Sequence, residues 1–339
     1  MLLKRLKMEK TERIKGFAQH ADGNLLETKD LTKVFTIGKR LTGSKLVAVN
    51  SVNLRMKKEK PEIFTLAGES GSGKTTLARI ILGLTEFTSG EMLYKGKDIT
   101  KLKSKKEKMW LKREIQPIFQ NPFEAFNPLK KVENYLFETA TRSGTNHDKK
   151  AAVNDALNMV GLNQNDVLGK YPHELSGGQL QRTAIARALI TTPDLLIADE
   201  PVSMIDASLR MSVLNFFKDL KEMKNVSIIY ITHDLATAYY ISDRIGIMYR
   251  GCLVELGPVE KVLKKPLHPY TKLLLESIPK TDPEHRWGNE IKMSNLEVKE
   301  YGSMGCKFAE RCPLASEECR KEAPKDVFVD GRLVKCILF

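Results

Sequence analysis

Residues 68–75 of this 339-residue chain read Gly-Glu-Ser-Gly-Ser-Gly-Lys-Thr, which fits the pattern G-x-x-x-x-G-K-[ST] at every fixed position. An apolar run at 62–67 precedes the pattern, and helical spacing over 77–84 follows it. The glycines let successive backbone N–H groups face phosphate oxygens, and the N-terminus of the following helix adds positive partial charge. These residues predict a strand, a phosphate-binding loop and a helix that bind a nucleoside triphosphate. The pattern alone does not separate kinases, GTPases, helicases and transporters.

Two side chains in this segment have predicted roles. Lys74 is expected to reach the β- and γ-phosphates, and Thr75 to give its hydroxyl to Mg²⁺. A chance Gly/Ser loop is the alternative, but the position between a strand and a helix argues against it. The predicted nucleotide-binding residues of the segment are Gly68, Glu69, Ser70, Gly71, Ser72, Gly73, Lys74, Thr75 and Thr76.

Polar side chains also follow three other apolar runs. One run ends at Asp199 and Glu200, a second is followed by His233, and a third by Gln120. Continuous apolar strands are typical of a parallel sheet covered by helices, and such a sheet presents ligands at the carboxyl ends of its strands. We expect Asp199 to hold Mg²⁺ through water and Glu200 to polarise an attacking water. The alternative for Glu200 is that it caps a helix, and the alternative for His233 is that it has only a structural role.

Residues 175–179, Leu-Ser-Gly-Gly-Gln, precede a helix rich in Arg and Ala, and alone they could be a turn before a capped helix. With the motifs above, in this order and at these intervals, they resemble the nucleotide-binding subunit of an ATP-binding cassette (ABC) transporter over about residues 25–260. The resemblance implies that Ser176, Gly177, Gly178 and Gln179 form a signature that contacts the ATP of a partner subunit, and that Asp206 belongs to a D-loop. It also implies that Gln120 is a Q-loop residue that ligates Mg²⁺ with Thr75 and Asp199. Glu200 matches the catalytic glutamate of the family, and His233 matches its switch histidine.

Two positions match the family less closely. Phe35 stands where the family places an aromatic that stacks on adenine, although Phe35 could equally belong to the core. The D-loop departs from the usual Ala-Leu at Met204 and Ile205, but Asp206 is kept.

The resemblance implies an α/β fold of the ABC-type P-loop NTPase class, with a RecA-like core and antiparallel β and helical subdomains. We expect a basic N-terminal extension at 1–24, an ABC ATPase domain at 25–260 with its helical subdomain at about 121–185, and a C-terminal extension at 261–339. The extension is expected to be small, irregular and cysteine-containing.

Charge and hydropathy narrow the location and the partners. The formal net charge is +13, but the excess of Lys and Arg lies within 1–60 and 95–113, so it is interpreted as solvated basic faces and not as a nucleic-acid site. No apolar run reaches the roughly 18 to 20 residues that span a bilayer, and the N-terminus lacks the apolar stretch of a signal peptide. A cytosolic protein that associates peripherally with the cytoplasmic face of the membrane is expected.

The resemblance further implies that the chain is an ATPase that binds ATP and Mg²⁺. Two such cassettes, identical or different, dimerise head to tail, with ATP between the phosphate loop of one and the signature of the other. Two transmembrane permease subunits, and indirectly an extracytoplasmic solute-binding protein, are the implied partners. The helical segment after Gln120 is expected to transmit opening and closing to the permease.

Two segments indicate the branch of the family. Residues 171–174, Tyr-Pro-His-Glu, and 266–271, Pro-Leu-His-Pro-Tyr-Thr, resemble the ATPases of oligopeptide and dipeptide importers. We therefore predict a subunit that powers import of oligopeptides, dipeptides or related solutes such as oligosaccharides. The alternatives are a soluble ABC ATPase acting on DNA or ribosomes, and an exporter cassette. A soluble ATPase is disfavoured because the interval from Gln120 to Ser176 is short and the chain has a single cassette. An exporter cassette is disfavoured by the His-Pro-Tyr extension.

Four of the five cysteines fall near the C-terminus: Cys306, Cys312, Cys319 and Cys336. Their gaps lack the C-x₂₋₄-C pairs typical of zinc sites. Wide, uneven gaps suit a cluster held by four thiolates, and the segment resembles the extension of peptide-importer ATPases in which such cysteines ligate a 4Fe–4S cluster. Zinc and no metal remain open. Cys252, in an apolar strand, is expected to be a buried small residue.

Overall fold

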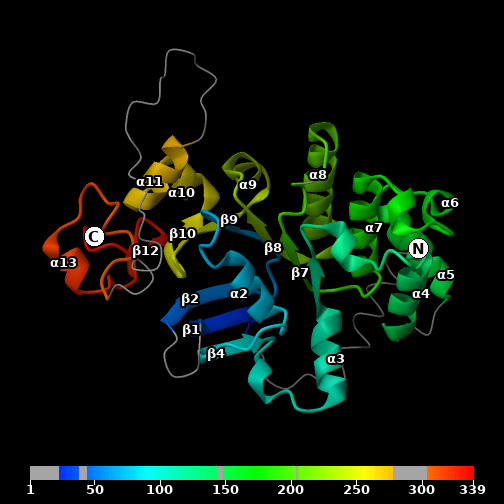
Figure 1. Cartoon of the computed structure of the whole chain (residues 1–339), viewed down its shortest axis with the longest axis horizontal. Coiled ribbons are helices and arrows are strands. Elements are labelled where there is room, and N and C mark those ends of the chain that lie inside the picture. Colours follow the sequence, from blue (N-terminus) through cyan, green and yellow to red (C-terminus); the bar gives the residue numbers. More distant parts are fainter. Residues whose placement is uncertain (1–22, 38–43, 144–147, 204, 278–303) are drawn as a thin grey trace.

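The computed structural model describes residues 23–37, 44–143, 148–203, 205–277 and 304–339. The predicted extension at 1–24 therefore lies almost wholly outside the described residues, as does Met204. The described chain forms two sheets with helices around them (Figure 1). Among these helices, none is long and apolar enough to cross a membrane.

An eight-stranded sheet forms the centre of the molecule. In order across the sheet, its strands are β11 (Val327–Val329), β12 (Arg332–Val334), β10 (Cys252–Pro258), β9 (Arg244–Tyr249), β3 (Ile63–Ala67), β8 (Ser227–Thr232), β7 (Leu195–Asp199) and β6 (Ile115–Ile118). The five strands from β9 to β6 are parallel, and β10, β12 and β11 continue the sheet antiparallel. Every residue of β3 and β8 is buried, as predicted for a parallel sheet covered on both faces.

The two faces of this sheet belong to different cores. In β8, Ile228 and Tyr230 pack on one side with residues of the helical segment, while Ile229 and Ile231 pack on the other with Leu77 of the helix after the phosphate loop. This division follows from the strand geometry, since alternate side chains point to opposite faces. The apolar runs read from the sequence therefore contribute to two cores at once.

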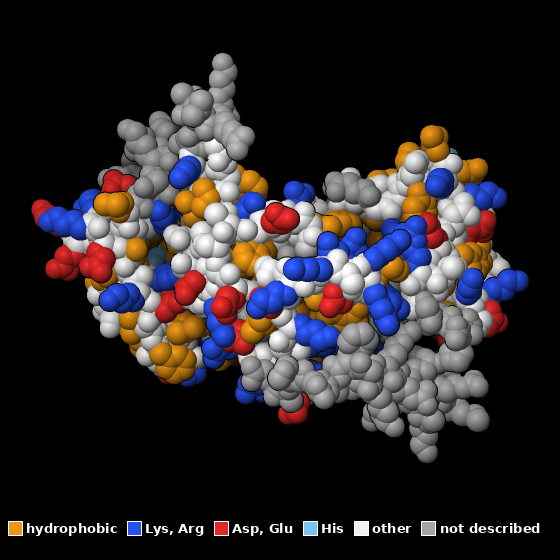
Figure 2. All heavy atoms as spheres, turned by 90° about the horizontal axis from the view of Figure 1, so that it is seen from below, with side chains coloured by type: hydrophobic (Ala, Val, Ile, Leu, Met, Phe, Trp, Pro, Cys, Tyr) orange, Lys and Arg blue, Asp and Glu red, His pale blue; other side chains and the backbone are white. Residues whose placement is uncertain are grey.

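An antiparallel sheet of four strands (Figure 1) contributes buried side chains to the core that contains Leu77. Its strands, in order, are β2 (Ser44–Lys57), β1 (Asn24–Ile37), β4 (Ser89–Tyr94) and β5 (Lys97–Asp98). The short helix η1 (Ile99–Lys101) and α3 (Lys105–Glu114) follow this sheet. Only Leu111 of α3 is buried, so most of the basic segment at 95–113 is solvated, and on the face in Figure 2 Lys and Arg are interspersed with Asp and Glu.

Between β6 and β7 the described chain is helical, and Figure 1 shows these helices at one end of the molecule. They are η2 (Pro122–Ala125), α4 (Val132–Arg142), α5 (Lys149–Met159), α6 (Gln164–Val167), η3 (Pro172–Glu174) and α7 (Gly177–Leu189). Helices α2 (Lys74–Ile81), α8 (Ala207–Lys224) and α9 (Leu235–Ile241) follow strands β3, β7 and β8. This alternation of strand and helix builds the parallel sheet.

The C-terminal part lies at the opposite end from α4–α7 (Figure 1). It comprises α10 (Val259–Lys264), α11 (Pro269–Glu276), α13 (Glu317–Lys321) and the hairpin of β11 and β12. Asp330 and Gly331 join the two strands, and both have positive φ angles, 49° and 74°, as the tight hairpin turn requires. β12 pairs with β10, and the buried Arg332 guanidinium lies 3.3 Å from Glu255. The tail is thus part of the central sheet.

Candidate nucleotide-binding site

The phosphate loop joins the end of β3 to the start of α2. Gly68, Gly71 and Gly73 have φ angles of 146°, 75° and 105°, which lie in the region that favours glycine. A Cβ atom at Gly73 would lie 2.2 Å from the carbonyl oxygen of Ala48, so glycine is required there for close approach as well. The loop can therefore curl around an anion at the N-terminus of α2.

Lys74 lies inside this loop. Its Nζ donates to the carbonyl oxygens of Gly68 and Glu69, each at 2.7 Å, and to Ser72 Oγ at 3.2 Å. Burial lowers the pKa of Lys74, while the carboxylates of Glu200, Asp199 and Glu69 act in the opposite direction. The ammonium is therefore held by oxygen atoms of the loop itself, at the start of α2.

The structure brings together two of the three predicted magnesium ligands. The Asp199 carboxylate at the end of β7 is hydrogen-bonded to the side chain of Thr75 at the start of α2. Burial raises the pKa of Asp199, although Thr75 and Lys74 lower it. Hydroxyl and carboxylate oxygens suit Mg²⁺. Gln120, the third predicted ligand, instead donates from Nε2 to Glu200 Oε2 at 3.1 Å.

Glu200 is the centre of a cluster at the ends of three parallel strands. Gln120 follows β6, Glu200 follows β7 and His233 follows β8. Besides Gln120, His233 contacts the carboxylate, with Nδ1 2.9 Å from Glu200 Oε1. The backbone of Glu200 has a φ of 46°, a strained conformation for a residue with a side chain, and its N–H donates to Ile231. The three predicted catalytic residues therefore form one hydrogen-bonded group.

The signature residues lie elsewhere in the chain. Ser176 is the N-cap of α7, and its Oγ accepts from the Gln179 N–H at 3.2 Å while Gln179 Oε1 accepts from the Ser176 N–H at 3.0 Å. Ser176 and Gly177 are exposed and Gly178 is half-buried. In Figure 1, α7 lies among the helices at the end of the molecule, whereas α2 lies against the antiparallel sheet. One chain therefore does not join its own signature to its phosphate loop.

Two other predicted residues are solvent-accessible. Phe35, in β1, is 37% exposed, with Lys33 Nζ 4.8 Å from its ring centroid, so it does not belong to the core. Asp206 is the exposed N-cap residue of α8 and makes no side-chain capping bond. Both side chains are therefore accessible to solvent in the described structure.

Two residues at this site were not predicted as part of it. The guanidinium of Arg311 pairs with the Glu69 carboxylate, and Tyr270 Oη accepts from the Glu69 N–H. Tyr270 was singled out in the His-Pro-Tyr segment, but only as a mark of lineage. No sequence signal could have linked Arg311 to a residue 242 positions earlier.

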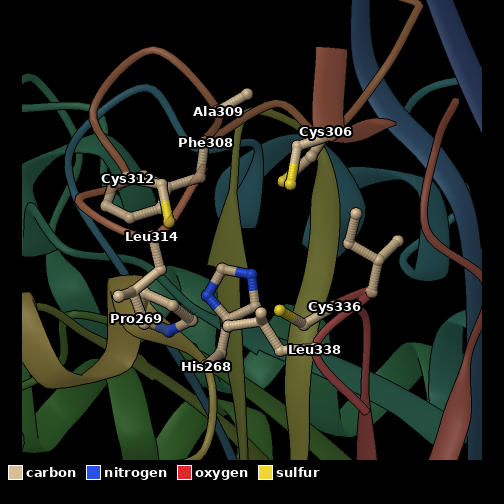
Figure 3. Close-up of a pocket in the computed structure, with 11 residues that line it drawn as sticks. His268, Pro269, Cys306, Phe308, Ala309, Cys312, Leu314, Cys336 and Leu338 are labelled. Atoms are coloured by element: carbon tan, nitrogen blue, oxygen red, sulfur yellow. The ribbon is translucent and has the colours of Figure 1, made fainter. Parts of the chain in front are cut away.

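The four C-terminal cysteines and His268 line one small pocket, in which Figure 3 labels Cys306, Cys312, Cys336 and His268. All four are free thiols, and burial raises the pKa of Cys306 to about 11. Within the described ranges, no three His, Cys, Asp or Glu side chains are arranged to hold a metal ion. The structure thus gathers the predicted cysteines around one pocket but does not arrange them around a metal ion, so the predicted metal site is not shown. Cys252 is buried in β10 as predicted, outside this pocket.

The glycine loop, the parallel-strand carboxylates and the separate signature helix define an ATP-binding cassette. The chain belongs to the ATP-binding proteins of ABC transporters, since the family model "ABC transporter" matches residues 49–203 and "Oligopeptide/dipeptide transporter, C-terminal region" matches residues 254–319. It is 38% identical over 314 residues to the oligopeptide transport ATP-binding protein AppF of Bacillus subtilis (strain 168), covering 89% of this chain and 93% of that protein. It is 43% identical over 280 residues to the oligopeptide transport ATP-binding protein OppF of Streptococcus pyogenes serotype M1, covering 82% and 89%.

Solved structures agree with this family. The ATP-binding cassette MJ0796, as a dimer in a post-hydrolysis state bound to ADP and Pi, matches with a TM-score of 0.61 and 27% identity, covering 69% of this chain and 98% of that chain. The cassette cbiO1 from Clostridium perfringens matches with a TM-score of 0.61 and 25% identity, covering 72% and 92%. The predicted fold class and the predicted ATPase class are both confirmed.

Proposed function

We propose that this chain hydrolyses ATP to power import of oligopeptides or dipeptides through a membrane permease. The observation that carries the solute class is the match of residues 254–319 to the C-terminal region of oligopeptide/dipeptide transporters. Relatives named as oligopeptide transport ATP-binding proteins cover more than four fifths of the chain. The substrate class therefore rests on this likeness.

At the ATP site, each group has a task that its position supports. The loop N–H groups and Lys74 bind the phosphates, and Phe35 stacks on the adenine. Thr75 and Asp199 would hold Mg²⁺, which neutralises charge on the transferred phosphoryl group. Glu200 orients and polarises the attacking water, and its own orientation is fixed by Gln120 and His233.

A second cassette completes the site. The exposed N-terminus of α7 offers the Ser176 hydroxyl and the N–H groups of Gly177 and Gly178 to a γ-phosphate held by a partner. Asp206 lies at the exposed start of α8, where it can contact that partner. ATP then stabilises the closed dimer as an interfacial ligand, and loss of the γ-phosphate after hydrolysis releases it.

The permease docks on the helical segment, and the chain works at the cytoplasmic face of the membrane. Phe123 and Leu129, which follow Gln120, are 47% and 84% exposed. Large exposed apolar side chains that follow Gln120 so soon in the chain suit a contact that senses the nucleotide. Two permease subunits and, indirectly, a solute-binding protein are the partners.

Solute uptake tests the proposed function. Deletion of the gene should abolish uptake of labelled di- to pentapeptides by intact cells, and the wild-type chain should restore it. The Glu200→Gln variant should fail to restore it although it is made at the same level. If the deletion abolishes uptake of an oligosaccharide and leaves peptide uptake unchanged, the proposed solute class is wrong. If the deletion leaves all uptake unchanged and the chain sediments with ribosomes or DNA, the proposed function is wrong.

We also propose that the cysteine pocket of the extension, residues 261–339, holds a 4Fe–4S cluster with a structural role. The supporting observation is that four free thiols from separate points of the chain line one pocket. Zinc would need its sulfurs about 2.3 Å from a single point, and the described side chains are not arranged around one ion. A four-iron cluster accepts thiolates set farther apart, because each binds a different iron. His268 is not a ligand, since its Nδ1 accepts from the Tyr270 N–H and the ring also bonds the Lys335 backbone.

Iron analysis and colour test the cluster. Anaerobically purified protein should be brown and contain about four irons per chain, as four-thiolate ligation implies. Serine at Cys306, Cys312, Cys319 or Cys336 should bleach it and expose residues after about 300 to protease, since metal binding contributes folding free energy. Cys252→Ser is the matched control and should stay brown. A colourless protein, with zinc or with no metal, would contradict the cluster.

A further inference from the structure

The C-terminal extension contacts the phosphate loop directly, at Glu69. The Arg311 guanidinium forms two parallel hydrogen bonds with the carboxylate, from Nη1 to Oε2 and from Nη2 to Oε1, both at 3.0 Å. On the backbone of the same residue, the Glu69 N–H donates to Tyr270 Oη at 3.0 Å. A bidentate guanidinium–carboxylate pair fixes direction as well as distance. The extension therefore holds both the side chain and the main chain of this loop residue.

Arg311 is itself held rigidly. Its side chain is 13% exposed, and the guanidinium lies over the rings of Tyr249 and Phe308, 5.7 and 5.8 Å from their centroids. Phe308 is buried, and its carbonyl accepts the Arg311 N–H in the loop between Cys306 and Cys312. A guanidinium packed against two rings in this way loses little further freedom when it binds a carboxylate.

Tyr270 is fixed by the start of α11. His268 caps this helix, its Nδ1 accepting the Tyr270 N–H at 3.0 Å, and Pro269 occupies the first turn. Tyr270 is fully buried, and burial raises its pKa, so the phenol stays protonated. The His-Pro-Tyr segment thus has a physical task in this chain, because it aims one hydroxyl at the backbone of the phosphate loop.

Glu69 also contacts Lys74 of the phosphate loop. Its carbonyl oxygen accepts from Lys74 Nζ at 2.7 Å and from the Ser72 N–H at 3.2 Å. One residue therefore connects the extension to the lysine that meets the phosphates. We propose that Arg311 and Tyr270 are positioning residues for ATP binding, which act through Glu69 to hold the phosphate loop in its binding conformation.

The expected consequence is a change in ATP affinity more than in turnover. A loop rich in glycine loses conformational freedom when it closes on phosphates, and a loop already held in place loses less. The contacts of Arg311 and Tyr270 with Glu69 are called the clamp below. Removing the clamp weakens binding of ATP in the ground state and in the transition state alike, so KM rises and kcat at saturating ATP stays nearly unchanged. Arg311→Met should raise the KM for ATP and the dissociation constant of an ATP analogue by about 5- to 20-fold, the size of a typical coupling between sites.

The test compares variants of the full chain in its assembled complex. Glu69→Gln and Tyr270→Phe should raise the KM for ATP in the same direction as Arg311→Met, and Arg311→Lys should restore part of the affinity. The double variant Glu69→Gln/Arg311→Met should resemble either single variant, because both remove one contact. The matched control is Arg320→Met, which removes the exposed pair with Glu310 in the same extension and should leave the KM unchanged.

Thermal unfolding separates positioning from folding. If Arg311→Met lowers the melting temperature with no change in KM, or if the effects of Glu69→Gln and Arg311→Met simply add, the proposed clamp is wrong. The charge exchange Glu69→Arg/Arg311→Glu gives a second test where a single variant fails to fold, because it should recover affinity that Glu69→Arg alone loses. The inference rests on the ATPase activity. If the wild-type chain binds no ATP, the proposed ATPase activity is wrong. If the wild-type chain binds ATP and the variants bind it equally well, only the proposed clamp is wrong.

Discussion

Replacing Glu200 by glutamine is expected to slow ATP hydrolysis by roughly 10²–10⁴-fold, the usual contribution of a general base. Glutamine keeps the size of the side chain but loses the charge that polarises the attacking water. Lys74, Thr75 and Asp199 are untouched, so the variant should still bind ATP. Without hydrolysis the γ-phosphate stays between the subunits, and the two cassettes should remain closed.

Two measurements on the purified complex check this expectation. Turnover should be nearly lost, while retained nucleotide, after rapid removal of free ATP, should be ATP and not ADP. Glu91→Gln is a matched control, because Glu91 is an exposed carboxylate on β4 of the antiparallel sheet, whereas Glu200 follows β7 of the central sheet. Turnover of Glu200→Gln within a few-fold of wild type would show that another group activates the water.

The sequence predicts most of the ATP site because the relevant signals are local. Each predicted side chain follows an apolar run, and parallel strands present their carboxyl ends at one edge of the sheet. His233 was therefore expected at the same edge of the sheet as Glu200, and the structure places both Gln120 and His233 within hydrogen-bond distance of the Glu200 carboxylate. The hydrogen bond from Gln120 to Glu200 was not predictable, because it depends on side-chain rotamers.

The C-terminal extension shows the opposite case. The Asp330–Gly331 turn is a local hairpin signal, but nothing local indicates that β12 pairs with β10 or that Arg332 meets Glu255. The clamp on Glu69 is likewise set by tertiary packing around Phe308. Such contacts join residues far apart in the chain, and one sequence carries no periodic pattern for them.

The second large effect concerns the ATP site shared between two subunits, where Lys74→Ala and Ser176→Arg should impair different steps. Lys74→Ala should weaken ATP binding to the isolated chain by roughly 30-fold to several thousand-fold, because removing one partner of a buried charge pair costs about 2–5 kcal/mol. Ser176→Arg should leave that binding unchanged, since Ser176 is exposed at the start of α7 and its hydroxyl accepts from the Gln179 N–H of the same helix. In the assembled complex, however, an arginine there should block the γ-phosphate face of the partner and abolish ATP-driven closure and turnover.

A second capped helix supplies the control for Ser176→Arg. Ser104 caps α3 through the same reciprocal bonds, here with Glu107, so Ser104→Arg removes an equivalent cap and adds the same charge elsewhere. Each loss of a cap should cost about 1 kcal/mol of stability, but only Ser176→Arg should prevent closure. Binding of a fluorescent ATP analogue to the isolated chain and ATP-dependent dimerisation by size-exclusion chromatography measure the two steps. If Lys74→Ala and Ser176→Arg weaken binding to the isolated chain equally, each chain completes its own site, and the head-to-tail arrangement is wrong.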